Sequence, residues 1–434
     1  MTIPHKALIA AASICFSAPW AFASAPDWHS WRGPLANGSV EQGSFPVKFG
    51  ADNYLWRAAL PGRGCSTPIV LDGHVYLTSP ADGKDALLCY DLDGAEKWRA
   101  VFDQEKVGKH RNGSGSNASP VTDGKGVFAY YKSGTLAAVE LGRGGGKERW
   151  KTNLVDRFGP DTLFWDHGTS PVLTEKYVVM ARMHHGESWL AAFDKTSGEM
   201  AWKVPRNYST PTECDNGYST PLVIKHPVAG STAKESILVW GAQHVTIHNA
   251  SDGQVAWSCG DFNPEDNRMW PSIATPVVVG DMAIIAYGRN DRGVPRLYGI
   301  RLTGDGDVTK TNHVWKRDDL GTFVPTPAVH KGRVILLRDR GEVACIDPMT
   351  GDTVWEARFP KHRANYYASP LVAGDRLYAA REDGTVFVAN IAGDKLELLA
   401  ENEMGENIIG SPVPAATNRL LIRGAMHLFC IAGE

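Results

Sequence analysis

The sequence has no excess of charge of either sign and no long apolar run after its first two dozen residues. Its 434 residues include 45 Lys and Arg and 48 Asp and Glu, so the formal net charge is -3 at pH 7. This balance argues against a general nucleic-acid-binding protein, because such proteins carry a basic surface. With 43% hydrophobic and 21% charged residues, the composition also excludes an intrinsically disordered or collagen-like chain.

A sustained helical period is lacking too, whereas turn-forming residues are frequent. The chain contains 45 Gly and 26 Pro, and its apolar segments alternate with Gly or Asp turns. Such alternation is typical of short antiparallel strands. We therefore expect an all-β protein with little helix.

The first residues read as an export signal. A short start with one lysine is followed by apolar residues 7–23, which end in the A-x-A pattern Ala21-Phe22-Ala23. This pattern predicts a signal peptide over residues 1–23, cleaved after Ala23, and a periplasmic mature protein of residues 24–434. The alternative is an uncleaved membrane anchor. We expect no other transmembrane segment, because no later apolar run reaches spanning length.

Cysteine is scarce. Outside the signal peptide the chain has six cysteines: Cys65, Cys89, Cys214, Cys259, Cys345 and Cys430. Cys89, Cys345 and Cys430 lie inside apolar runs, which favours buried free thiols. Cys214 and Cys259 lie in predicted loops and either form a disulfide in an oxidising compartment or remain free.

One unit of sequence recurs eight times. A Ser/Thr-Pro pair followed by an apolar run marks each unit, and successive prolines are 42 to 55 residues apart. Each unit except the last contains four strand-like segments, and the pairs open the first strand of each unit. The pairs are Thr67-Pro68, Ser119-Pro120, Ser170-Pro171, Thr220-Pro221, Thr275-Pro276, Thr326-Pro327, Ser369-Pro370 and Ser411-Pro412.

A tryptophan near the end of most units supports an eight-bladed β-propeller. The first six units carry this residue as Trp98, Trp150, Trp202, Trp257, Trp315 and Trp355. The seventh unit has Leu398 in its place, and the eighth unit has only three strands. We expect these rings to pack between neighbouring blades. The missing strand of the last blade is predicted at residues 53–58, which closes the ring. A linear β-solenoid is the alternative. We expect one domain and a monomer.

Two segments resemble a known repeat. AFDKTSGEMAW (192–202) and CIDPMTGDTVW (345–355) resemble the tryptophan-docking repeat of quinoprotein alcohol dehydrogenases and of BamB-type assembly factors. WRGPLANG (31–38) is similar to the opening of exported PQQ-binding-like propellers. The resemblance covers the mature chain and implies the fold, whereas function stays open because one fold hosts many activities.

The quinoprotein resemblance implies features that this sequence does not have. The adjacent cysteine pair of that family, a C-x-x-C-H haem site and a segment matching its Ca²⁺ motifs are all lacking, so PQQ as a cofactor is disfavoured. The BamB resemblance implies an exported scaffold that binds a periplasmic protein partner.

The positions of nine arginines predict a ligand-binding site on one face of the propeller. Loops leading into the innermost strands, here called entering loops, meet the loops between second and third strands on one face, the funnel face. Guanidinium groups there suit an anionic ligand or saccharide. Alternatively each arginine pairs with a nearby acid, as Arg338 with Asp339 or Arg381 with Glu382. Arg182, Arg289, Arg338, Arg381 and Arg423 end second strands, and Arg63, Arg111, Arg268 and Arg363 lie in entering loops.

Other polar and aromatic residues complete the predicted site. Trp165 and Trp270 either stack on a ligand or seal a loop, and the remaining ligand-binding candidates are Asp166, Asp215, Asn216 and Asn365. The catalytic candidates for an acidic-glycan lyase are His110, His167, Tyr366 and Glu213, and the candidates for a divalent metal are His167, His184, His185 and Gln243. Hydrogen-bonded loop histidines are the alternative.

From the sequence we therefore expect a non-catalytic exported propeller that binds a ligand or protein partner on its funnel face. A periplasmic acidic-glycan lyase is the first alternative: an arginine neutralises the uronate carboxylate, and a histidine or Tyr366 takes the α-proton. A PQQ-dependent dehydrogenase is the second alternative.

Overall fold

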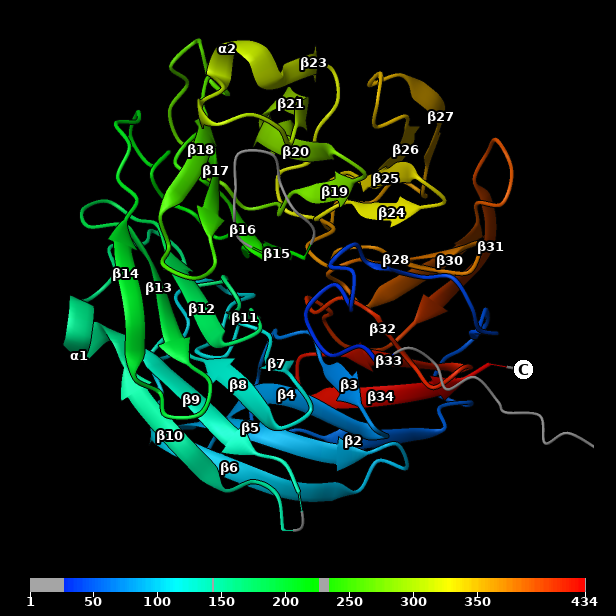
Figure 1. The fold of residues 1–434 in the computed structure, drawn as a ribbon. Helices are drawn as coiled ribbons and strands as arrows, with labels where there is room; N and C mark the ends of the chain where they lie inside the picture. The colour runs from blue at the N-terminus through cyan, green and yellow to red at the C-terminus, as the bar shows by residue number, and fades with distance from the viewer. Residues whose placement is uncertain (1–26, 143, 226–233, 434) are drawn as a thin grey trace, which may run out of the picture.

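Eight sheets, each built on four antiparallel strands, surround a central axis (Figure 1). The computed structural model describes residues 27–142, 144–225 and 234–433, so the predicted signal peptide lies outside the described residues. The helical elements of this part are α1 (Leu154–Phe158), α2 (Thr309–Asn312) and the 3-10 turn η1 (Asn290–Arg292). None of them is long and apolar enough to cross a membrane. The predicted eight-bladed propeller is confirmed.

The first four blades use consecutive strands, starting from the axis. Blade 1 has β3 (Ile69–Leu71), β4 (His74–Ala81), β5 (Lys84–Asp91) and β6 (Glu96–Gln104). Blade 2 has β7 (Val121–Thr122), β8 (Gly126–Tyr130), β9 (Thr135–Glu140) and β10 (Glu148–Asn153). Blade 3 has β11 (Val172–Leu173), β12 (Tyr177–Arg182), β13 (Trp189–Asp194) and β14 (Met200–Pro205). Blade 4 has β15 (Leu222–Ile224), β16 (Ser236–Gly241), β17 (His244–Asn249) and β18 (Val255–Cys259), with β22 (Gly306–Asp307) added outside.

The other four blades follow the same plan. Blade 5 has β19 (Val277–Val279), β20 (Met282–Arg289), β21 (Val294–Arg301) and β23 (His313–Arg317). Blade 6 has β24 (Ala328–His330), β25 (Arg333–Leu337), β26 (Glu342–Ile346) and β27 (Thr353–Arg358). Blade 7 has β28 (Leu371–Ala373), β29 (Arg376–Ala380), β30 (Thr385–Asn390) and β31 (Glu397–Glu403). Blade 8 has β32 (Val413–Ala415), β33 (Arg419–Arg423) and β34 (His427–Ala432), and its outer strand is β2 (Trp56–Ala59).

Strand β2 joins the two ends of the chain. It pairs antiparallel with β34, and Trp56 lies opposite Cys430. The amide of Leu55 extends this pairing by donating to the carbonyl of Cys430 at 2.8 Å. The first and last strands of the propeller thus share one sheet, and the last blade has four strands like the others.

The tryptophans of the repeat dock on the next blade. The indole N–H of Trp150 in blade 2 donates to the carbonyl of Lys195 in blade 3 at 3.0 Å, and its ring lies over Gly198. Gly198 has a φ of 75°, and a Cβ at this position would lie 2.6 Å from the indole. Glycine is therefore needed here for two reasons: the turn requires a positive φ, and the indole ring leaves no room for a Cβ. Trp56, Trp202 and Trp315 repeat this arrangement on Gly94, Gly253 and Gly351.

The Ser/Thr-Pro hydroxyls form a closed ring of hydrogen bonds around the axis, here called the hydroxyl ring. In each blade the backbone N–H of the Ser or Thr donates to the hydroxyl of the next blade, with lengths of 2.9 to 3.1 Å. The eighth bond runs from Ser411 to Thr67 and so links the last blade to the first. This accounts for the recurrence of a hydroxyl before each proline.

Residues 28–40, here called the plug segment, lie across the axis on the side opposite the entering loops. Their carbonyls accept hydrogen bonds from Val70 and Thr122 of blades 1 and 2, and from Val329 and Val372 of blades 6 and 7. Within the plug segment, β1 (Ser39–Val40) pairs in parallel with β28.

Arg32 holds the plug segment to two blades. Its guanidinium is buried and donates to the carbonyls of Pro370 at 2.6 Å and Pro327 at 2.7 Å. Burial without an acid partner lowers the pKa of Arg32 to about 9. A buried charge is tolerated here because both carbonyls are directed at the guanidinium.

All six cysteines of the described chain are free. Cys89, Cys345 and Cys430 are buried, as predicted. The disulfide considered between Cys214 and Cys259 does not form: each is buried in the core, and the Cys214 thiol lies 3.3 Å from the carbonyl of Asn267.

Candidate functional site

The entering loops enclose a funnel of about 510 Å³. Its floor is formed by Trp31 of the plug segment, and above the floor stand six hydroxyls of the hydroxyl ring. The wall carries both apolar and polar side chains, including Cys65, His110, Asn117, Trp165, Tyr218, Arg289, Phe323, Asn365 and Tyr367. The funnel therefore combines aromatic rings with hydrogen-bonding groups, as small-ligand pockets do.

A buried ion pair fastens one wall of the funnel. Asp166 pairs with the ammonium of Lys132, and it also accepts hydrogen bonds from the backbone N–H groups of Lys109 and His110 at 2.8 and 3.0 Å. Burial alone would raise the pKa of Asp166, but these donors hold it below its usual value. Asp166 is thus occupied in shaping the loop before blade 2.

Two further carboxylates do the same for other loops. Asp339 accepts from the N–H groups of Phe323 and Val324 at 2.8 and 3.0 Å, and burial raises its pKa. Glu382 accepts from the Asn365 N–H at 3.0 Å. The entering loops are therefore held in place by carboxylates whose oxygens are already used.

Two of the five second-strand arginines predicted to bind a ligand are buried inside the fold. Arg182 and Arg423 are fully buried and donate to backbone carbonyls, among them Gly159 and Thr78. This prediction was wrong for both, because the guanidinium groups replace missing backbone partners inside the fold.

The other three second-strand arginines are paired with neighbours. Arg289 forms a bidentate pair with Asp291 at 2.8 and 2.7 Å, and Arg381 pairs with Asp383 at 2.9 Å. Arg338 donates to the side-chain oxygen of Asn290 at 2.6 Å. The alternative, in which each arginine pairs with a nearby side chain, is therefore correct for these three. The predicted partners Asp339 and Glu382 are wrong, since Arg338 bonds to Asn290 and Arg381 pairs with Asp383.

The arginines of the entering loops behave differently. Arg63, Arg268 and Arg363 are exposed, and no side-chain hydrogen bond or ion pair fixes them within the described residues. Arg111 is also exposed and reaches Glu382 at 3.1 Å. These four are the predicted arginines that remain accessible on the funnel face.

The two predicted stacking rings have separate positions. Trp165 is 43% exposed and lines the funnel, with its ring edge-on to His110 at a centroid distance of 5.1 Å. Trp270 is only 3% exposed, and it packs against Tyr287 under the guanidinium of Arg296. Trp270 therefore seals a loop, which corrects its assignment as a ligand platform.

The catalytic candidates do not converge. His110 lines the funnel, but His167 is buried against Tyr130, and burial lowers the pKa of His167 well below its usual value. Tyr366 is also buried, which raises its pKa. Glu213 is half-buried outside the funnel lining, and burial raises its pKa. An acid and a base are thus not brought together at the funnel.

The metal candidates are likewise dispersed. Both ring nitrogens of His184 are within 3.1 Å of protein partners, and His185, which is 88% exposed, pairs with Asp215 at 3.0 Å. Gln243 is buried in the turn between β16 and β17. Asn216 is buried too, where its carbonyl accepts from Ser272. Among residues 27–142, 144–225 and 234–433, no three His, Cys, Asp or Glu side chains form a metal-binding group.

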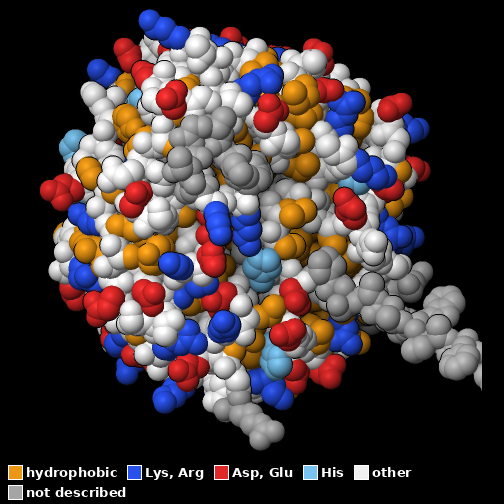
Figure 2. All heavy atoms as spheres, in the orientation of Figure 1, with side chains coloured by type: hydrophobic (Ala, Val, Ile, Leu, Met, Phe, Trp, Pro, Cys, Tyr) orange, Lys and Arg blue, Asp and Glu red, His pale blue; other side chains and the backbone are white. Residues whose placement is uncertain are grey.

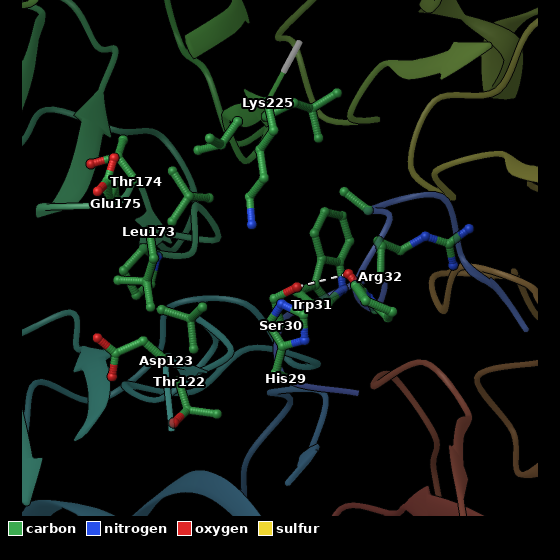
Figure 3. A pocket seen from close by; sticks show the side chains of 18 of the residues that line it. His29, Ser30, Trp31, Arg32, Thr122, Asp123, Leu173, Thr174, Glu175 and Lys225 are labelled. Atoms are coloured by element: carbon green, nitrogen blue, oxygen red, sulfur yellow. Dashed lines mark hydrogen bonds between the residues drawn. The ribbon is translucent and has the colours of Figure 1, made fainter. Parts of the chain in front are cut away.

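A second cavity of about 630 Å³ lies on the opposite face (Figure 3). The plug segment and the first-to-second-strand turns of blades 1 to 4 line it. In Figure 3 the side chain of Lys225 extends into this cavity toward Ser30 and Trp31, with Asp123 and Glu175 on another side. Acidic and basic side chains are interspersed over the face shown in Figure 2. Trp31 lines both cavities, so the plug segment separates them.

Sequence reasoning missed several funnel residues. Trp31, Phe323 and Tyr367 were not predicted, although Phe323 and Tyr367 lie within three residues of a repeat's Ser/Thr-Pro pair. The spacing to that pair was the available signal. Trp31 carries no such signal, because its place depends on the long-range hydrogen bonds of the plug segment.

Solved structures with this architecture differ in function. BamB from Moraxella catarrhalis superposes with a TM-score of 0.62 at 17% identity, covering 87% of this chain and 99% of that one. A europium-containing methanol dehydrogenase has a TM-score of 0.70 at 11% identity, covering 94% and 98%. Quinohemoprotein alcohol dehydrogenase from Comamonas testosteroni has a TM-score of 0.67 at 12% identity, covering 94% and 80%. At these identities the likeness shows the fold alone.

The funnel does not fit a quinone and its cation. The funnel acids Asp166 and Asp339 already accept backbone N–H groups, and Arg289 is neutralised by Asp291. Cys65 has no cysteine beside it and directs its thiol at the Asn112 carbonyl at 2.7 Å. The donor set for a Ca²⁺-bound quinone, which needs free carboxylates and cationic partners, is not available among these residues.

The sequence itself places the chain in a family. No curated protein matches it in sequence. A family model described as outer membrane protein assembly factor BamB matches residues 51–258, 141–304 and 304–418, which together span most of the chain. The eight-bladed ring and the docked tryptophans agree with that match, and the chain belongs to the BamB-type family of PQQ-like β-propellers.

Proposed function

We propose that this chain is an exported, non-catalytic propeller that binds a protein partner on the rim of its funnel face. The observation that supports this most is the rim itself, where large exposed hydrophobic side chains and unpaired arginines occur on the entering loops of one face. Protein–protein interfaces are enriched in aromatic residues, Met and Arg, and hot spots in Trp and Arg. Family membership supports a protein partner as well, because the BamB resemblance implies one.

The rim is built from several entering loops. Its hydrophobic members include Phe164, which is 56% exposed, and Trp165 beside it. The loop before blade 5 adds Met269 at 40% exposure, with the exposed Arg268 directly before it in sequence. Arg363 stands on the loop before blade 7. A rim that carries exposed apolar side chains and unpaired guanidinium groups suits a partner segment with both acidic and apolar side chains.

The distribution of titratable groups supports binding rather than catalysis. A lyase on acidic glycans needs a base at the α-proton of the uronate and a cation at the carboxylate beside it. His167 and Tyr366 are buried and Arg289 is already paired, which leaves His110 as the one catalytic candidate of the sequence analysis that lines the funnel.

Site-specific photocrosslinking in cells tests the proposal. A photoreactive residue replaces Trp165 on the rim or, as the matched control, Val354 on β27, which is 41% exposed. We expect a defined crosslinked partner from position 165 and none from position 354. Crosslinks from position 354 alone would contradict the rim assignment.

Charge reversal gives a second measure. Arg268→Glu should weaken partner capture, whereas Lys176→Glu, in the β11–β12 turn on the opposite face, should leave it unchanged. Release of unsaturated products from uronic-acid oligosaccharides, seen as near-ultraviolet absorbance, would overturn the non-catalytic part of the proposal. N-terminal sequencing of the periplasmic protein tests export and should begin at Ser24.

A further inference from the structure

The funnel floor is distinct from the rim. Trp31 is half-buried there, and its indole N–H makes no hydrogen bond within the described residues. The plug segment fixes the backbone on both sides of Trp31, through the carbonyl of His29 on blade 2 and the guanidinium of Arg32 on blades 6 and 7. The backbone that carries this large ring is thus held in place, and the ring lines the funnel.

Hydroxyl groups surround this ring. Six members of the hydroxyl ring line the funnel: Thr67, Ser119, Thr220, Thr326, Ser369 and Ser411. Each oxygen accepts a backbone N–H, but no hydroxyl proton has an acceptor in the described part of the chain. These protons are therefore available to a ligand above Trp31.

The wall adds neutral polar groups. The phenol oxygen of Tyr218 accepts a hydrogen bond from the backbone N–H of Trp165 at 3.0 Å, and the phenol oxygen of Tyr367 accepts one from the side-chain amide of Asn365 at 3.3 Å. Both phenol protons are free to donate. The side-chain oxygen of Asn117 is used by Ser114, whereas its amide protons have no acceptor within the described residues.

The charges of the funnel are compensated at the floor. Arg289 is paired with Asp291, Asp166 with Lys132, and Asp339 lies buried beneath backbone N–H groups. Arg340 also lines the funnel, but it is exposed and donates to the carbonyl of Arg363 at 2.6 Å, and the other unpaired arginines stand on the rim. A neutral ligand with many hydroxyls and one apolar face matches the groups that remain.

We propose that the funnel floor binds a neutral saccharide, with one sugar ring stacked on Trp31 and its hydroxyls bonded to the hydroxyl ring, Tyr218 and Tyr367. The funnel, at about 510 Å³, lies within the range of roughly 300–1,000 Å³ typical of small-ligand pockets. This site uses none of the rim residues and does not depend on the proposed partner.

Isothermal titration of the purified mature protein tests the site. The probes are maltose, cellobiose and diacetylchitobiose, with digalacturonic acid as the anionic comparison. We expect at least one neutral disaccharide to bind and digalacturonic acid to bind more weakly. If no neutral disaccharide binds, or if digalacturonic acid binds more tightly, the proposal is overturned.

Variants assign the binding to the floor. Trp31→Ala should weaken the neutral disaccharide by about tenfold or more, corresponding to the loss of about 1.4 kcal/mol. Trp31→Phe should retain most affinity, and Leu35→Ala, in the same segment but 75% exposed, should bind like the parent protein. Equal affinity of Trp31→Ala and the parent would refute the stacking role.

A conservative variant covers the case in which Trp31→Ala fails to fold. Tyr367→Phe removes one hydroxyl and keeps the ring, and it should weaken binding by roughly three- to tenfold, as expected for one hydrogen bond. Unchanged affinity in Tyr367→Phe would contradict the assigned hydrogen bond. Crosslinking from position 165 in the Trp31→Ala background separates the two proposals, because the partner should still be captured when the sugar is not bound.

Discussion

The hydroxyl ring predicts a specific cost for removing one hydroxyl. Thr326 is 1% exposed, and its hydroxyl accepts the N–H of Thr275 at 2.9 Å. Thr326→Val keeps the shape of the side chain but leaves that buried N–H without an acceptor. An unsatisfied buried donor costs about 1–3 kcal/mol, so the unfolding free energy should fall by that amount.

Urea denaturation is the suitable assay. In a chain of this length the entropy of unfolding is so large that 1 kcal/mol shifts the melting temperature by only about 1 °C. Thr350→Val is the matched control, because Thr350 also accepts a backbone N–H, from Asp352, but in an exposed turn where water replaces it. The control should change stability by less than about 0.5 kcal/mol. Equal effects of the two substitutions would refute the reasoning.

Two further predictions concern packing and pH. Gly198→Ala should destabilise the protein by at least about 1 kcal/mol more than Gly280→Ala in urea melts, because both glycines have positive φ but only the first has an indole, that of Trp150, in the way. Burial raises the pKa of Asp85 from 3.8 to about 7, so its ionisation makes stability fall as pH rises from about 4 to about 7. Asp85→Asn should flatten this part of the stability–pH curve, and an unchanged slope would show that Asp85 does not titrate in this range.

The fold was predictable because its signals are local and repeated. Each Ser/Thr-Pro pair, Gly turn and tryptophan recurs at a fixed place in the unit, so eight weak signals support one conclusion. The site was less predictable, since it depends on which groups pair across blades. Arg289 and Arg63 look alike in sequence, yet one is neutralised by Asp291 and the other is exposed.

Trp31 is a functional candidate that the sequence could not have revealed. Its neighbours in sequence carry no funnel pattern, and its position follows from hydrogen bonds to strands as distant as β28. Trp270 was misassigned for the converse reason, because its loop belongs to the funnel face while its ring turns into the core. Loop membership predicts the face of the molecule, but the direction of a side chain depends on tertiary packing.

The pairing of β2 with β34 also sets the order in which this molecule is assembled. Strand β2 is made early in synthesis, but its partner is among the last residues made, so this pairing cannot form until the rest of the propeller has been synthesised. Contacts between such distant residues slow folding and leave strand edges exposed in the meantime. A chain that stops before β34 loses both the pairing with β2 and the seam between its ends. Loss of these few terminal residues therefore prevents closure of the whole ring. We expect a chain truncated before β34 to be degraded by proteases rather than to persist as a slightly smaller propeller.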